Sequence, residues 1–199
     1  MTTRTSRVLL VFSAFLVGLM LFAAVALLVG GRAAITGATQ PSAIGGPFRL
    51  VDQEGRAVSD RDMKGKPFLV FFGFTHCPDV CPTTLFEVSE VLSKLGPDSD
   101  RVGALFVTVD PERDTPAKMK DYLASFDQHL RGLTGDADAI AGMQKSYRVY
   151  AKKVALTDGG YTMDHSALVY LMDKEGRFVA PFNLKRRPED SAADLRRYL

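Results

Sequence analysis

The centre of the predicted fold is the segment at residues 68–82, which reads FLVFFGFTHCPDVCP. Its first part is a short apolar run between Pro67 and Gly73, and such a run is typical of a fully buried strand. Its second part carries the only two cysteines of the chain, Cys77 and Cys81. The segment therefore predicts a buried strand that leads directly into a site of sulfur chemistry.

A helix is expected immediately after the second cysteine. Apolar residues recur there at helical spacing, and proline is well tolerated in the first turn of a helix, so we predict a helix from Pro82 to about Leu95. Both cysteines then lie on the strand-to-helix loop, with Cys81 beside the helix N-terminus. The partial positive charge of that terminus favours thiolate over thiol.

Two simpler interpretations compete with a functional cysteine pair. The cysteines could be inert core thiols, but Pro78 and Asp79 between them are typical of exposed loops. They could form a structural disulfide, but closing so short a loop removes little chain entropy. A functional pair is the better interpretation.

The N-terminal region predicts a membrane anchor. Residues 8–30 contain no charged side chain, and 23 residues in a helix suffice to cross the ~30 Å hydrocarbon core. Arg4 and Arg7 precede this run, which places residues 1–7 in the cytoplasm and the rest of the chain on the other side. A cleaved signal peptide is the alternative, although its apolar core is usually only ~7–15 residues long. Residues 31–46, rich in small and polar side chains, are predicted as a linker to a domain at 47–199.

The charge balance argues against nucleic-acid binding. Residues 1–31 hold two of the 25 Lys and Arg residues and none of the 23 acidic residues, so 23 of each sign remain in residues 32–199. The domain has no basic excess to attract phosphates.

The remaining pattern alternates strands with helices. Strands are predicted at 102–109, 130–133, 161–172 and 177–182, helices from 116, at 136–147 and at 188–199, and a hairpin at 48–58. This order indicates an α/β fold with a mixed sheet.

Three segments resemble the motifs of one family. They are residues 73–82 (GFTHCPDVCP), 107–116 (VTVDPERDTP) and 161–166 (YTMDHS). Together they resemble the Sco family, also called SenC or PrrC, whose members are thioredoxin-like copper proteins of cytochrome oxidase assembly. The family more often has Thr where this chain has Ser166, which keeps the hydroxyl. The resemblance runs from about residue 47 to residue 199.

The resemblance implies a thioredoxin-like mixed sheet flanked by helices, with a copper site made of Cys77, Cys81 and His165. It implies a metallochaperone rather than an enzyme, held in the inner membrane with its domain facing the periplasm. The expected receiver of copper is the cytochrome c oxidase subunit that carries the copper A centre, and an upstream copper chaperone is a possible donor.

The donor atoms of that site suit copper. Thiolates select Cu(I), zinc or iron–sulfur clusters, and imidazole suits copper and zinc. A structural zinc site usually has four ligands and an iron–sulfur cluster about four cysteines. Two sulfurs and one nitrogen suit Cu(I), leave a position open for transfer, and supply the imidazole that Cu(II) needs.

Two aspartates in the motifs each have two possible interpretations. Asp164 is either an acceptor that orients His165 or a turn residue, and Asp110 lies near the site or caps a turn. Arg113 and Asp114 are expected to form a surface ion pair of little energetic value.

The other two histidines are weaker candidates for ligands. A chelate through His76 and the adjacent Cys77 would strain the loop, and His129 is expected to be a solvated surface residue.

A thiol–disulfide oxidoreductase or redox sensor is the alternative function. The spacing of Cys77 and Cys81 puts their Cα atoms roughly 6 Å apart in a helical turn, within disulfide range. Thioredoxin-like oxidoreductases usually have CxxC and a facing cis-proline, whereas residues 161–172 contain no proline. A peroxidase would need a different cysteine motif.

Overall fold

The computed structural model describes residues 13–26, 43–157 and 159–199. The chain divides into two units, residues 1–40 and 41–199. In the first unit, residues 13–26 are helical. None of the helices in the described ranges has the length and apolar character needed to cross a membrane. The predicted span at 8–30 and the linker at 31–46 both extend over residues outside those ranges.

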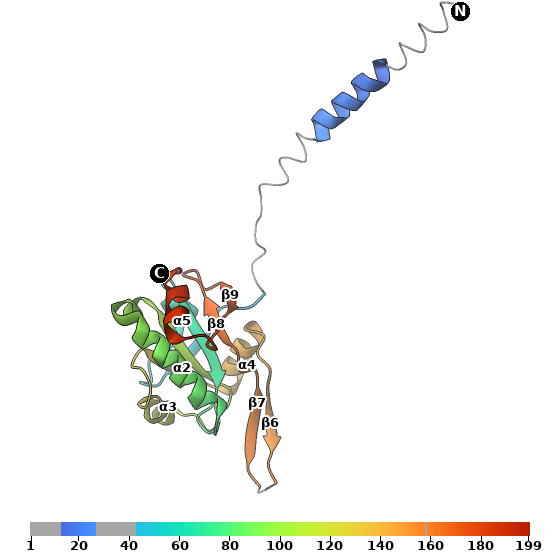
Figure 1. The fold of residues 1–199 in the computed structure, drawn as a ribbon. Coiled ribbons are helices and arrows are strands. Elements are labelled where there is room, and N and C mark those ends of the chain that lie inside the picture. Colours follow the sequence, from blue (N-terminus) through green and yellow to red (C-terminus); the bar gives the residue numbers. More distant parts are fainter. Residues whose placement is uncertain (1–12, 27–42, 158) are drawn as a thin grey trace, which may run out of the picture. The chain divides into compact units, whose positions relative to one another are not determined.

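The second unit is built on a seven-stranded mixed sheet (Figure 1). Its strands are β1 (Arg49–Asp52), β2 (Ala57–Ser59), β3 (Phe68–Gly73), β4 (Gly103–Thr108), β5 (Leu130–Thr134), β8 (Val169–Met172) and β9 (Phe178–Pro181). They lie in the order β2-β1-β5-β4-β3-β8-β9. The central strands β3, β4 and β5 are parallel and all other pairings are antiparallel. Every residue of β3 and β4 is buried, as expected for the middle of a sheet covered on both faces.

Helices cover both faces of this sheet. They are α2 (Val80–Leu95), α3 (Pro116–Leu123), α4 (Ala137–Ser146) and α5 (Pro188–Arg196). The run β3-α2-β4-α3-β5 steps across the sheet in one direction, so right-handed crossovers place α2 and α3 on the same face. Helix α5 packs beside α2 (Figure 1).

Helix α4 lies on the opposite face. Tyr147, at its C-terminal end, packs its ring 5.5 Å from that of Phe72. Cys81 of α2 lies instead against Gly73, the next residue of β3. Successive residues of a strand point to opposite faces, so α2 and α4 sandwich β3. The predicted mixed sheet flanked by helices is confirmed.

Three details differ from the prediction. The single strand expected at 161–172 is two strands in different sheets: β7 (Tyr161–His165) pairs with β6 (Ala151–Ala155), whereas β8 belongs to the main sheet. Strand β6 was not predicted. The helix expected from Pro82 begins at Val80, which puts Cys81 inside its first turn.

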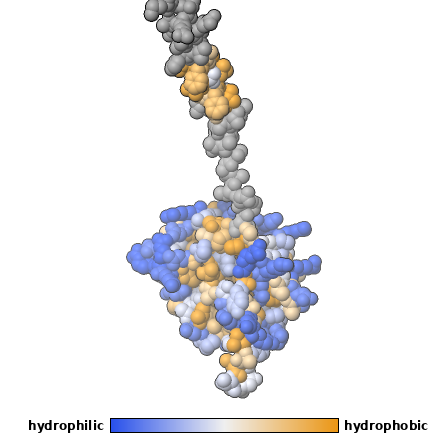
Figure 2. Space-filling model, turned by 90° about the vertical axis from the view of Figure 1, so that its right-hand side faces the viewer, coloured by the Kyte–Doolittle hydropathy of each residue, from blue (hydrophilic) through white to orange (hydrophobic). Residues whose placement is uncertain are grey.

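The β6–β7 pair projects from the body of the domain (Figures 1 and 2). Most of β6 is exposed, and hydrophobic side chains lie on its surface at Val154 and just beyond it at Leu156. This two-stranded sheet carries His165 at the end of β7 nearer the main sheet. One candidate ligand therefore comes from an element outside the seven-stranded sheet.

Candidate metal centre

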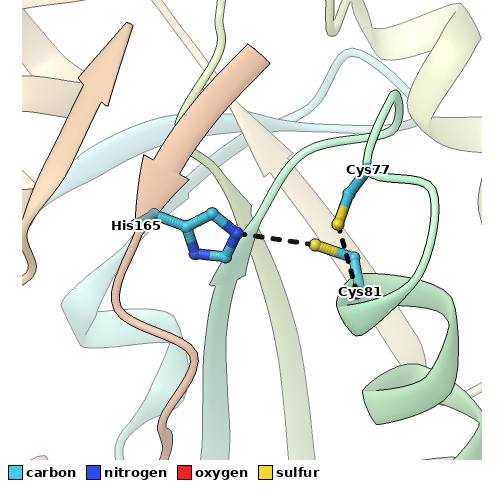
Figure 3. Close-up of side chains that lie close together, drawn as sticks. All are labelled: Cys77, Cys81 and His165. Atoms are coloured by element: carbon cyan, nitrogen blue, oxygen red, sulfur yellow. Dashed lines mark hydrogen bonds between the residues drawn. The ribbon is translucent and has the colours of Figure 1, made fainter. Parts of the chain in front are cut away.

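Three segments meet at the C-terminal end of β3 and bring Cys77, Cys81 and His165 together (Figure 3). Cys77 lies on the β3–α2 loop, Cys81 in the first turn of α2 and His165 at the end of β7. Nε2 of His165 is 3.7 Å from Sγ of Cys81, and the backbone N–H of Cys81 donates to Sγ of Cys77 at 3.4 Å. The three potential ligand atoms all lie within 4.8 Å of one another.

The imidazole of His165 is oriented for ligation. Its Nδ1 lies 3.0 Å from the carbonyl oxygen of Ser166. A carbonyl oxygen only accepts, so this contact holds the proton on Nδ1 and leaves the lone pair of Nε2 facing Cys81. The rings of Phe71 and Phe74 lie 6.4 and 5.7 Å from the imidazole, which restricts its rotation.

The two cysteines differ in exposure. Cys77 is partly exposed, as expected for a loop, whereas Cys81 is fully buried in the core. Burial raises the pKa of the Cys81 thiol above its ordinary value. This direction is opposite to the prediction that the helix N-terminus favours a Cys81 thiolate, and its largest cause is the loss of hydration on burial.

Asp114 holds the loop that precedes Cys77. Its carboxylate is completely buried and accepts hydrogen bonds from the backbone N–H of Thr75 (3.1 Å), the hydroxyl of Thr75 (2.6 Å) and the hydroxyl of Thr108 (2.6 Å). The expected Arg113–Asp114 surface ion pair was therefore wrong. A signal was present in the sequence, since Thr75 lies in the motif at 73–82 that carries both cysteines, and Thr108 and Asp114 both lie in the motif at 107–116.

Asp110 is also buried, and its backbone N–H donates to the same Thr108 hydroxyl at 2.8 Å, whereas its carboxylate makes other contacts. It accepts a hydrogen bond from the hydroxyl of Tyr161 at 3.0 Å and pairs with Nε of Arg113. It therefore connects the end of β4 to β7. Asp164 is exposed and lies within β7, so it is not a turn residue, and Nδ1 of His165 faces the carbonyl oxygen of Ser166 and not Asp164.

The remaining histidines lie outside the three-residue group. Nδ1 of His76 is 3.2 Å from the hydroxyl of Thr75. His129 was expected to be solvated, but its side chain is only 21% exposed and contacts Asp127 (2.6 Å) and Asp100 (3.1 Å) through its two ring nitrogens.

The donor set favours a soft metal ion. Bonds of about 2.0–2.3 Å from a metal to sulfur and nitrogen place three ligand atoms roughly 4 Å apart or less, so only a small closure of the observed arrangement is needed. Two sulfurs and one imidazole match the preference of copper, and within residues 13–26, 43–157 and 159–199 the group has no fourth side chain of the kind that closes a zinc site.

Comparisons with known proteins agree with this arrangement. The family model of SCO1/SenC matches residues 36–199. A solved structure of ScoI from Bradyrhizobium japonicum with copper bound is 68% identical, with a TM-score of 0.77, and the match covers 78% of this chain and 99% of that chain. The predicted thioredoxin-like fold is therefore confirmed.

Two further relatives extend the comparison. Protein SCO1 homolog 1, mitochondrial, from Arabidopsis thaliana is 41% identical over 77% of this chain, which spans only 46% of that relative's length. A structure of BsSco is 25% identical, with a TM-score of 0.62, and covers 80% of this chain and 95% of that one. BsSco is described as having a disulfide switch and as a member of the Sco family of cytochrome c oxidase assembly proteins.

Proposed function

This chain belongs to the SCO1/SenC family, and we propose that it is a copper chaperone that binds copper through Cys77, Cys81 and His165. The observation that carries the proposal is the convergence of these three side chains, with their ligand atoms within 4.8 Å of one another. Two thiolates hold Cu(I), and the imidazole adds the nitrogen ligand that Cu(II) prefers.

The exposure of the three residues supports a role in transfer. Cys81 is buried, whereas Cys77 and His165 are partly exposed. Copper passes between proteins by ligand exchange, in which an incoming ligand binds before an existing one leaves. The partly exposed side chains offer the route for that exchange, and the three-ligand set leaves a coordination position open.

The proposed receiver is the copper A centre of cytochrome c oxidase, and an upstream copper chaperone is the proposed donor. Support comes from membership in the family and from BsSco, which is described among cytochrome c oxidase assembly proteins. The sequence of residues 8–30 supports an anchor in the inner membrane, with the domain in the periplasm.

A thiol–disulfide function is the second candidate. Its supporting observations are the close approach of Cys77 to the backbone of Cys81 and the disulfide switch described for BsSco. In that function the two cysteines would exchange electrons with thiols of a partner, and His165 would not be essential.

Oxidase assembly in cells separates the two candidates. Strains carrying Cys77→Ser, Cys81→Ser or His165→Ala should all lack active copper oxidase, and added copper should restore part of the activity only in the His165→Ala strain, because both thiols remain. Normal oxidase activity with His165→Ala and failure of both cysteine variants would favour the thiol–disulfide function.

Protease treatment of spheroplasts tests the proposed location. External protease should digest the domain at 47–199 and leave a small anchor fragment. Full protection of the domain, or its release by a salt wash, would contradict the anchored periplasmic arrangement.

A further inference from the structure

The placement of His165 depends on contacts that hold the β6–β7 pair against the domain. This pair is a separate two-stranded sheet, so no backbone ladder of the main sheet fixes β7 relative to the cysteines. The cysteines are fixed by β3 and α2. Besides the short connection from β7 to β8, side chains that link the two parts therefore contribute to the distance between the sulfurs and the imidazole.

Arg113, on the loop between β4 and α3, makes the most extensive of these connections. Its Nε pairs with the carboxylate of Asp110, and its Nη1 donates to the carbonyl oxygen of Tyr161 at 3.0 Å. Its guanidinium carbon lies 3.8 Å from the centre of the Tyr161 ring, and the hydroxyl of Tyr161 donates to Asp110 at 3.0 Å. These three residues form a closed set of contacts, which we call the Arg113 clamp.

The clamp also reaches the cysteine side of the site. The guanidinium carbon of Arg113 lies 5.8 Å from the centre of the Phe74 ring, and that ring makes an edge contact with His165 at 5.7 Å. Phe74 is the first residue of the loop that carries Cys77. Arg113 therefore contacts both the segment that leads to the cysteines and the strand that leads to the histidine.

Placing Arg113 in this set of contacts leaves one of its nitrogens buried without a hydrogen bond among the described residues, which is unfavourable. Its Nη2 is buried without a hydrogen-bond partner in the described part of the chain, and a buried unpaired donor is unfavourable. The guanidinium group is planar and rigid, so its contacts define one orientation of Tyr161 relative to Asp110. Several fixed contacts, kept although one nitrogen is buried and unpaired within the ranges that the structure describes, are expected of a residue that positions its neighbours.

We propose that Arg113, with Asp110 and Tyr161, is a positioning residue that holds His165 at ligand distance from Cys77 and Cys81. The proposal rests on the proposed copper site. In it, the Arg113 clamp affects copper binding only through the imidazole of His165. Loss of the clamp should weaken Cu(II) binding, which needs the imidazole nitrogen, much more than Cu(I) binding, which the two thiolates can sustain.

A double-mutant cycle on the purified full-length chain tests the proposal. Arg113→Gln should lower the Cu(II) affinity by about tenfold or more, the usual effect of losing a residue that supports a ligand, and the Cu(I) affinity by less than about threefold. In a His165→Ala background, Arg113→Gln should have no further effect on Cu(II) affinity, because the group it positions is gone. Tyr161→Phe, which removes one hydroxyl, should give a smaller change in the same direction.

Arg131→Gln is the matched control. Arg131 pairs with the buried Asp52 at 2.7 Å, and its side chain is 30% exposed compared with 22% for Arg113. Removing it breaks an equivalent ion pair away from the site and should leave both copper affinities unchanged. In the metal-free protein, amide hydrogen exchange across residues 161–165 should accelerate in Arg113→Gln and stay unchanged in Arg131→Gln.

The outcomes separate this proposal from the proposed function. If His165→Ala lowers Cu(II) affinity but Arg113→Gln and Tyr161→Phe do not, the clamp has no positioning role. If Arg113→Gln lowers Cu(II) affinity equally with and without His165, it acts through general destabilisation and the proposal is overturned. If His165→Ala itself leaves Cu(II) affinity unchanged, the proposed copper site is wrong.

Discussion

A Cβ atom at Gly73 would lie 2.7 Å from Sγ of Cys81. The same Cβ would lie 2.7 Å from the ring of Phe106, so neither neighbour leaves room for it. Gly73 is the last residue of β3, and the absence of a side chain there creates the space that the buried sulfur occupies. The position of Cys81 therefore depends on a residue that has no functional group.

Gly73→Ala should displace Cys81 and weaken Cu(I) binding. Overpacking of this kind typically costs about 1–3 kcal/mol of unfolding free energy. Gly103→Ala is the matched control, because its Cβ would lie 2.7 Å from Cβ of Phe68, away from the site. Chemical denaturation should show both variants destabilised, whereas a Cu(I) competition titration should show weaker binding only for Gly73→Ala. Equal Cu(I) affinities in the two variants would contradict the role of Gly73.

Asp114→Asn should loosen the loop that carries Cys77. The amide keeps one acceptor oxygen and replaces the other with an NH₂ group, so at least one of the three donors from Thr75 and Thr108 loses its carboxylate acceptor. We expect a loss of about 1–3 kcal/mol in unfolding free energy. Hydrogen exchange at Thr75 and Cys77 should also accelerate. Unchanged exchange at these amides would show that the loop is held by other contacts.

His129 should make stability dependent on pH. Burial of the ring opposes protonation, but hydrogen bonds to Asp127 and Asp100 outweigh it and raise the pKa of His129 above its ordinary value. The folded state therefore binds this proton more tightly than the unfolded state. The resulting stabilisation is complete below about pH 6.5, the ordinary histidine pKa, and is lost as pH rises through the raised pKa.

Denaturation of the wild type and His129→Gln across this range measures the effect. The difference in unfolding free energy should be on the order of 1 kcal/mol at acidic pH, because one of the two carboxylates is exposed, and should shrink at alkaline pH. Asp127→Asn, which removes the closer carboxylate, should lose most of the same dependence. If the difference in unfolding free energy between the wild type and His129→Gln is the same at all pH values, His129 does not have a raised pKa in the folded state.

The apolar pattern predicted the central strands and most helices well. The strands at residues 68–73 and 103–108 are buried on both faces, so their apolar composition alone identifies them as strands. Strand β6 has the sequence AKKVA and is mostly exposed, so neither burial nor alternation identifies it. Without β6 as a partner, nothing in the sequence showed that residues 161–172 divide between two sheets.

The resemblance to a known family predicted the site residues, but it did not predict their burial or their hydrogen-bond partners. The resemblance to the family motifs implied Cys77, Cys81 and His165, which the structure places together. The enclosure of Asp114 depends in part on Thr75, which is 39 residues away, and Cys81 meets His165, which is 84 residues away. A sequence pattern read locally, such as the adjacent pair Arg113–Asp114, suggests an ion pair and misses the buried partners of each residue.

Copper affinity should fall in acid. Copper binding requires thiolates and a neutral imidazole, and the raised pKa of Cys81 means that the metal displaces a proton from this thiol at neutral pH. Each displaced proton lowers the apparent affinity about tenfold per pH unit below the pKa of its ligand. A Cu(I) competition titration from neutral to acidic pH measures this dependence. An affinity that stays flat over the range would place the copper on other ligands, such as methionine side chains.

The most direct test of the copper site is the amount of copper bound by the reduced full-length chain and three single variants, measured without oxygen against a competing chelator. The wild type should bind one Cu(I) per chain, and Cys77→Ser and Cys81→Ser should each lose it to the chelator. His165→Ala should keep Cu(I) more weakly and lose most of its Cu(II) affinity, with only the residual binding that two thiolates provide. Retention of wild-type Cu(I) affinity by either cysteine variant, or of wild-type Cu(II) affinity by His165→Ala, would contradict a copper centre built from these three residues.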